Sequence, residues 1–112
     1  MSNTFSVKWT LAAEDDLIHI IEYIHNKSPN NARLVLQRIK DTSSKLGKFP
    51  ERGRVVPETE SQGIFIFREL VASPWRIIYR ISHSNVYVLA VLDSRQNVED
   101  VLLTRIYRNK RE

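Results

Sequence analysis

Arginine side chains recur in the second half of this chain, at positions that alternate with apolar residues. Arg68, Arg76 and Arg80 lie within a stretch rich in Ile, Val, Leu, Tyr and Phe, and Arg95 follows that stretch. A guanidinium group is planar and stays protonated at any working pH, so it can bind a phosphate or a carboxylate through two parallel hydrogen bonds. These side chains therefore predict a surface that binds an anionic partner.

If these residues were catalytic, the chemistry that they would suit is RNA cleavage. Attack by a 2′-hydroxyl group requires a base, an acid for the leaving oxygen and a cation for the charge that develops on the phosphate. Arg76 and Arg95 could supply the cation, because a turn near His83 places Arg76 opposite the end of the next strand, shortly before Arg95. Arginine is a poor base, and His83 lies about 17 Å of strand away from Arg76. The sequence therefore favours binding over catalysis.

The residues that most resemble a metal site are His19, Glu22 and His25. Their three-residue spacing fans them around a helix, unlike the i, i+4 pair that binds zinc. The chain contains no cysteine, which excludes disulfides and thiolate ligands. We expect neither a metal ion nor a cofactor.

Three antiparallel strands joined by two tight turns are expected to hold the arginines. They occupy the stretch from Phe65 to Asp93, with turns at 72–74 and 82–85, and their composition is typical of strands. The middle strand alternates strictly, and its core-facing set is Trp75, Ile77, Tyr79 and Ile81. The set on the opposite face is Arg76, Ile78, Arg80 and Ser82.

The register of the first two strands decides whether the arginines meet. If the turn is centred on Ser73, even positions pair with even positions, and Arg68 lies opposite Ile78 and diagonal to Arg76 and Arg80. Diagonal neighbours on one sheet face are about 7–8 Å apart. This register also keeps the phenylalanines of the first strand on the core face. We therefore predict a cluster of three guanidinium groups on one face.

The aromatic and acidic residues of these strands are expected to be structural. In this register Glu69 falls on the core face near Trp75 and Tyr79. An unpaired buried carboxylate is costly, so we expect Glu69 to be a hydrogen-bonded internal anchor rather than a proton-transfer group. Trp9 and Trp75 could stack on bases, but both continue apolar alternations and are expected in the core.

Two helices are expected to precede the strands. Residues 5–9 alternate as a short strand, Thr10 can cap the first helix, and Ser28 followed by Pro29 is a strong start signal for the second. The short connection between the helices predicts an antiparallel hairpin. The stretch 48–62 is irregular, so it has packing of its own or carries function. After the last strand, Asn97 is expected to cap a final helix whose last turns hold Arg105 and Arg108.

The predicted fold is therefore α+β, in the order β-α-α-β-β-β(-α). It has an antiparallel sheet with an N-terminal helical hairpin packed on one face and a short C-terminal helix. With 112 residues, one domain covering 1–112 is expected.

The overall composition is that of a soluble globular protein. The formal charge of +4 suits an acidic partner, either nucleic acid or an acidic peptide. No apolar segment approaches the ~20 residues that span a membrane, and the first residues lack the pattern of a signal peptide. We expect a cytoplasmic protein with no membrane contact.

Several stretches, in this order, resemble the ParE/RelE toxin superfamily of bacterial type II toxin–antitoxin modules. They are FSVKWTLAAEDDLIHIIEYI, FPERGRVVPE, FRELV, PWRIIYRI and the apolar strand that ends in LDSR. The resemblance covers nearly the whole chain. It implies a small cytoplasmic toxin that a co-encoded antitoxin neutralises by wrapping an extended and helical tail over the toxin, so a toxin–antitoxin hetero-oligomer is expected.

The two best-known branches of this superfamily differ in their chemistry. RelE-like members cleave mRNA in the ribosome with basic side chains and commonly a helix tyrosine, whereas ParE-like members poison DNA gyrase. Arg76 and Arg95 match arginines of the family, but the paired lysines of the RelE branch would fall at Phe67 and Glu69, and its tyrosine near Val101.

The resemblance is therefore closer to the ParE branch, which FRELV also resembles. The run Asp93-Ser94-Arg95-Gln96 departs from that branch, which often has histidine and a double arginine there. We expect a ParE-like toxin that binds DNA gyrase, with Arg68, Arg76, Arg80 and Arg95 contacting the target or the antitoxin. The alternatives are a ribosome-dependent mRNA endonuclease that uses Arg76 and Arg95, and an antitoxin-binding domain that has lost toxicity.

Overall fold

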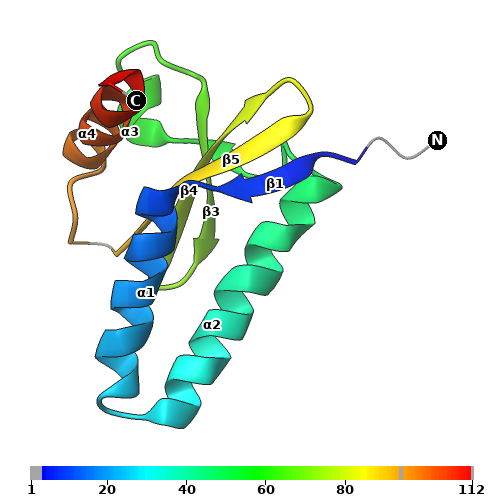
Figure 1. Cartoon of the computed structure of the whole chain (residues 1–112). Helices are drawn as coiled ribbons and strands as arrows, with labels where there is room; N and C mark the ends of the chain where they lie inside the picture. Colours follow the sequence, from blue (N-terminus) through cyan, green and yellow to red (C-terminus); the bar gives the residue numbers. More distant parts are fainter. Residues whose placement is uncertain (1–3, 94, 112) are drawn as a thin grey trace.

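The computed structural model describes residues 4–93 and 95–111, and it describes side chains as far as Arg105. A five-stranded sheet in the order β1-β5-β4-β3-β2 separates two layers of helix (Figure 1). The strands are β1 (Ser6–Trp9), β2 (Arg54–Val55), β3 (Phe67–Ala72), β4 (Trp75–Ser82) and β5 (Asn85–Leu92). The helices are α1 (Leu11–His25), α2 (Pro29–Ser44), the 3₁₀ turn η1 (Lys45–Gly47), α3 (Pro57–Glu60) and α4 (Val98–Arg111).

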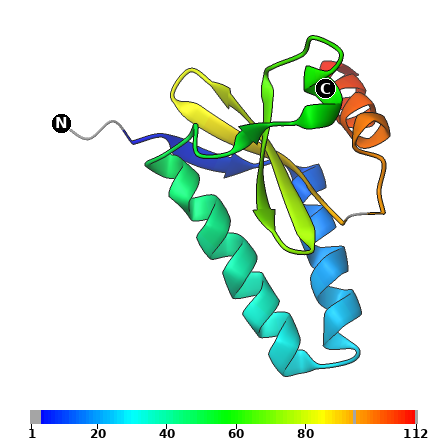
Figure 2. The same ribbon diagram turned by 180° about the vertical axis from the view of Figure 1, so that it is seen from behind.

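The predicted α+β architecture is confirmed, with one correction to the sheet. The helical hairpin α1–α2 packs on one face and α4 lies on the other (Figures 1 and 2). However, β1 pairs with β5 in parallel, so the sheet is mixed rather than antiparallel. The alternation at residues 5–9 predicts a strand but contains no information about its direction, because side chains alternate in the same way in both arrangements.

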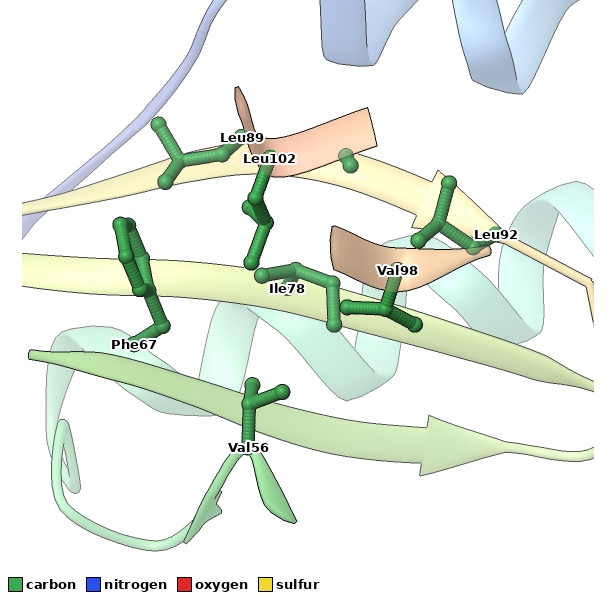
Figure 3. Packing of buried hydrophobic residues seen from close by; sticks show 8 residues of the cluster. Val56, Phe67, Ile78, Leu89, Leu92, Val98 and Leu102 are labelled. Atoms are coloured by element: carbon green, nitrogen blue, oxygen red, sulfur yellow. The ribbon is translucent and has the colours of Figure 1, made fainter. Parts of the chain in front are cut away.

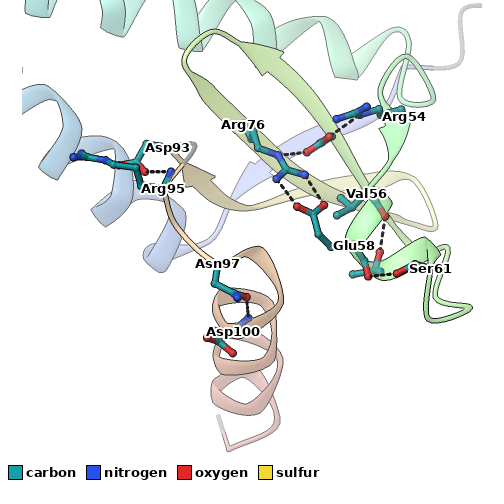
Figure 4. Close-up of polar contacts among 11 residues, drawn as sticks. Arg54, Val56, Glu58, Ser61, Arg76, Asp93, Arg95, Asn97 and Asp100 are labelled. Atoms are coloured by element: carbon teal, nitrogen blue, oxygen red, sulfur yellow. Dashed lines mark hydrogen bonds and ion pairs between the residues drawn. The ribbon is translucent and has the colours of Figure 1, made fainter.

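The predicted helix starts are confirmed by their capping hydrogen bonds. The side chain of Thr10 accepts from the Ala13 amide at 3.1 Å, and that of Ser28 accepts from the Asn31 amide at 3.2 Å. Asn97 accepts from the Asp100 amide at 3.0 Å (Figure 4). Each cap satisfies an amide that has no partner within its helix. The side chain of Arg108, predicted for the last turns of α4, lies outside the described residues.

Both faces of the sheet are buried against helices. On the hairpin face, Ala13, Leu17 and Ile39 pack against Ile77 and Val91. On the α4 face, the buried cluster contains Val56, Phe67, Ile78, Leu89, Ala90, Leu92, Val98 and Leu102 (Figure 3). β5 lies between β1 and β4 and is almost wholly buried, as its uninterrupted apolar sequence predicts.

The predicted register between β3 and β4 is wrong by one residue. Ala72 pairs with Trp75, and Glu69 rather than Arg68 lies opposite Ile78. Proline has no amide hydrogen to donate to a strand ladder, and a hairpin turn of two residues is the tightest common type. Pro74 therefore belongs to the turn with Ser73. Every residue of β3 consequently faces the side opposite to the one predicted.

Candidate functional site

Arg76 is held between two carboxylates on the α4 face of the sheet. Its Nη1 and Nη2 donate to the two carboxylate oxygens of Glu58 at 2.7 and 2.8 Å, and its Nε donates to Glu69 at 2.5 Å (Figure 4). The contact with Glu58 has the parallel, two-bond geometry that is strongest for arginine and carboxylate. The pair of Nη1 and Nη2 hydrogen atoms that could bind a phosphate through two parallel bonds is therefore already bonded to Glu58.

Glu69 is the buried centre of this ion-pair network. Its side chain has no exposed surface, and its second oxygen accepts from Arg54 Nε at 2.6 Å. The register places Arg54 of β2 opposite Glu69. Glu69 is the hydrogen-bonded internal anchor that we expected. Its predicted position beside Trp75 and Tyr79 on the hairpin face is wrong, because the register is shifted by one residue.

Glu58 and Arg76 hold each other in their charged forms. Hydrogen bonds from Arg76 lower the pKa of the Glu58 carboxyl to about 2, against the opposing effect of burial. The two carboxylates in turn raise the pKa of Arg76 above its ordinary value, with Glu58 the larger cause. A carboxylate with so low a pKa is a poor general base and cannot act as a general acid at pH 7.

The predicted cluster of three arginines does not form. Arg68 lies on the hairpin face, opposite Tyr79, and its Nη1 donates to the carbonyl oxygen of Gly53 at 2.8 Å. Arg80 lies on the α4 face and is exposed, and it makes no ion pair within the described residues. Arg68 and Arg80 are therefore on different faces of the sheet, and Arg76 is neutralised within the protein.

Arg95 does not contact Arg76, although the last residue of β5 lies beside Arg76. Arg76 pairs with Leu92, as hairpin geometry predicts. Beyond β5, Arg95 is directed towards α1 and away from Arg76 (Figure 4). Its side chain is 90% exposed and lies 3.6 Å from the carboxylate of Asp93. It lines a hollow of about 610 Å³, together with His19 and Tyr23 of α1.

A buried tyrosine fixes the loop that leads to this network. Tyr79 donates to the carbonyl oxygen of Pro50 at 2.7 Å and accepts from the Gly53 amide at 2.9 Å. Burial raises the pKa of Tyr79. A β-carbon on Gly53 would overlap the carbonyl oxygen of Glu69, so only glycine fits at this close approach. The alternation of β4 predicts a buried Tyr79, but it does not identify the partners of the hydroxyl group.

The ion pair between Asp16 and Arg105, which the sequence did not predict, binds the unpaired backbone edge of β5. β1 ends at Trp9, so the last residues of β5 have no strand beside them. The Val91 amide donates to Asp16 at 2.9 Å, and Arg105 donates to the Leu89 carbonyl at 2.6 Å. Asp16 and Arg105 also pair with each other at 2.9 Å. α4 is therefore joined to α1 at the β-bulge that follows Val88.

A large apolar groove runs along the helical hairpin. It has a volume of about 800 Å³ and lies between α1, α2 and the edge strand β1. Its apolar lining is Val7, Trp9, Leu17, Ile18, Ile21 and Leu36, and charged residues at its margin include Glu14, Glu22 and Lys40. Trp9 is thus part of the hairpin packing, as expected, and also a wall of this groove.

Two further findings concern metal ions and membranes. Among residues 4–93 and 95–105, no group of three or more His, Cys, Asp or Glu side chains is arranged to hold a metal ion. Within the same described part of the chain, no helix is both long and apolar enough to cross a bilayer.

Residues 7–98 match the family model of the ParE toxin of the type II toxin–antitoxin system parDE. Toxin RelE2 of Caulobacter vibrioides is 34% identical over 86 residues, which are 76% of this chain and 90% of the relative. The chain belongs to the ParE toxin family, within the ParE/RelE superfamily of type II toxins.

Two solved structures have the same fold. The chromosomal ParDE system from P. aeruginosa matches with a TM-score of 0.67 and 22% identity, over 82% of this chain and 98% of that chain. The RelBE2 toxin–antitoxin complex from Mycobacterium tuberculosis matches with a TM-score of 0.54 and 21% identity, over 83% and 94%.

Proposed function

We propose that this toxin inhibits growth as ParE-like proteins do, by binding DNA gyrase, and that a co-encoded antitoxin neutralises it. In this proposal the protein is a binder rather than a nuclease, and it acts in the cytoplasm. Arg80 and Arg95 are its exposed arginine contacts, whereas Arg68 and Arg76 support the fold.

The observation that supports this proposal is that Glu58 and Glu69 occupy the hydrogen-bond donors of Arg76. A nuclease of this superfamily would need that guanidinium group free to stabilise charge on a phosphate. Here the carboxylates of Glu58 and Glu69 neutralise this group. Arg95 is directed towards α1 and away from Arg76 (Figure 4). The described residues around Arg76 include no histidine or lysine hydrogen-bonded to this network.

A supercoiling reaction with purified gyrase and relaxed plasmid tests the target. We expect the toxin to inhibit supercoiling and to leave linear DNA after the complexes are denatured. Arg95→Ala should weaken this effect at least fivefold. Arg38→Ala, which removes an exposed arginine from α2, should not change it. A wide titration that traps no cleavage complex would refute gyrase as the target.

The groove between α1 and α2 is the surface that we propose for the antitoxin. An amphipathic helix buries one apolar face in such a groove. Ile18 lines the groove and is 52% exposed, and Leu34 is a comparably exposed residue of α2 outside the groove lining. Ile18→Glu should weaken antitoxin binding at least tenfold, and Leu34→Glu should leave it within twofold. Equal losses in both variants would place the antitoxin elsewhere.

The runner-up function is mRNA cleavage, and the similarity to a protein named Toxin RelE2 favours it. This function would require Glu58 to leave Arg76 when RNA binds. Cleavage of mRNA on ribosomes that is lost in both Arg76→Ala and Arg95→Ala would establish it. Harmless expression of the chain without its antitoxin would instead indicate a domain that has lost toxicity.

A further inference from the structure

A part of the α4 face carries six polar side chains, and Phe67 of β3 is the apolar neighbour of Arg80 beside them. This part lies at the end of the sheet that holds the β4–β5 turn, and this end extends away from α4 (Figures 1 and 2). Three strands, β1, β5 and β4, contribute two residues each. We call this surface the hairpin-end face, and its residues are Ser6, Lys8, Arg80, Ser82, Asn85 and Tyr87.

The strand registers place these six residues in two rows. In one row, Lys8 is the partner of Tyr87, and Tyr87 is the partner of Arg80. In the other row, Ser6 is the partner of Asn85, which pairs with Ser82. Neighbouring strands are about 4.8 Å apart, so Lys8 and Arg80 have backbones about 10 Å apart with the tyrosine between them.

Burial confirms that the six residues share a face. In β1, Val7 and Trp9 pack towards the helical hairpin, so Ser6 and Lys8 must face the other way. Tyr87 packs partly against the α4 cluster, which places its row on that side of the sheet. Ser6, Lys8 and Arg80 are exposed, and the other three are half-buried.

The charge of this face is uncompensated. Lys8 and Arg80 form no ion pair among the residues that the structure describes, whereas Arg54, Arg76 and Arg105 all do. None of the six positions carries a carboxylate, although the chain has 13 acidic residues. A face whose charges are all positive attracts an anionic partner.

We infer that the hairpin-end face binds the sugar-phosphate backbone of a nucleic acid. Contacts to phosphate and sugar come from Arg, Lys, Ser, Asn and Tyr side chains, which are the residue types present. A tyrosine ring flanked by cations also suits a base of a single strand. An acidic peptide would use the cations but has less use for the hydroxyl and aromatic groups. This inference goes beyond the proposed function, and it can be tested without gyrase or antitoxin.

The test measures binding of a fluorescent 20-nucleotide oligothymidylate to the purified full chain at 50 mM salt. The double variant Lys8→Ala/Arg80→Ala should bind about tenfold more weakly than wild type. The control Arg38→Ala/Lys45→Ala removes the same charge from exposed positions near and on α2, and it should stay within about twofold. The salt dependence of the affinity should also decrease, by about 1.4 in the slope of log K against log salt, because two phosphate contacts are lost.

Parallel titrations with duplex DNA and with RNA of the same length show which type of nucleic acid the face binds. The double variant should lose affinity for every type that the wild-type protein binds. Asn85→Asp places a carboxylate in the middle of the face with little change in shape, so it tests the same surface if the double variant does not fold. The inference is overturned if wild type shows no binding, or if the α2 control loses as much affinity. It is also overturned if polyglutamate displaces the oligonucleotide at lower concentration than unlabelled oligothymidylate does.

Discussion

Glu58→Gln is the substitution that most directly measures how far the ion pair with Arg76 stabilises the protein. Arg76 lowers the pKa of Glu58 from 4.5 to about 2. At full strength such a shift corresponds to about 3.4 kcal/mol. However, 35% of the Glu58 side chain is exposed, and solvent screening reduces the value of a partly exposed pair. We therefore expect the variant to lose about 1 kcal/mol of unfolding free energy at pH 6.

The pH dependence of this loss has a definite sign. Because the folded-state pKa of Glu58 is below its unfolded value, the stabilisation is complete above about pH 4.5 and disappears as pH falls through about 2. Urea unfolding at several values between pH 6 and pH 3 should show the gap in unfolding free energy between wild type and Glu58→Gln narrowing to less than about half near pH 3.

Glu60→Gln is the matched control for this experiment. Glu60 lies in the same short helix α3 and is exposed, and it makes no ion pair in the described part of the chain. Its substitution should change the unfolding free energy by less than about 0.5 kcal/mol at every pH. A Glu58→Gln variant as stable as wild type at pH 6, or a gap that does not change with pH, would refute the role given to this ion pair.

Three other substitutions test separate parts of the structure. Gly53→Ala should destabilise the protein by about 2 kcal/mol or more in thermal unfolding, because its methyl group overlaps the Glu69 carbonyl oxygen; unchanged stability would show that the loop relaxes freely. Asp16→Asn should cost about 2 kcal/mol, because it leaves the largely buried Arg105 without its carboxylate; calorimetry against wild type measures this, and a loss below about 0.5 kcal/mol would contradict it. Arg95→Ala should leave stability within about 0.5 kcal/mol, since this side chain is almost fully exposed; a larger loss in urea unfolding would show that Arg95 has a structural role.

The parts of the fold that depend on local chemistry were predictable from the sequence. Thr10, Ser28 and Asn97 are capping residues at the starts of apolar stripes, and each one caps its helix in the structure. The uninterrupted apolar run of β5 likewise identified a strand buried on both faces. In these cases the residue and its partner are neighbours in sequence, so one short stretch contains the whole signal.

The register of β3 was not predictable from alternation alone. The prediction gave the first two of the three strands a single core face, and it therefore placed Phe65 and Phe67 on the side of Trp75 and Tyr79. The structure has two buried faces, and Phe67 packs beneath α4 with Val98 and Leu102. Pro74 was the better signal, because a residue without an amide hydrogen belongs in the turn.

The partners of Arg76 and Asp16 are distant in sequence. Glu58 comes from the stretch 48–62, whose packing against the sheet has no periodic signature, and Arg105 reaches Asp16 across 89 positions. A sheet face with arginines and no acid was itself an indication that an acid from elsewhere had to approach. This pattern alone could not show which arginine would be neutralised and which would stay exposed.

We propose that this toxin does not cut RNA, because Glu58 and Glu69 occupy the hydrogen-bond donors of Arg76. Mapping the 5′ ends of cellular mRNA after induction of the toxin without its antitoxin tests this claim most directly. We predict growth arrest with no new 5′ ends within coding regions. New ends at ribosome-bound codons that disappear in the Arg76→Ala variant would contradict the account.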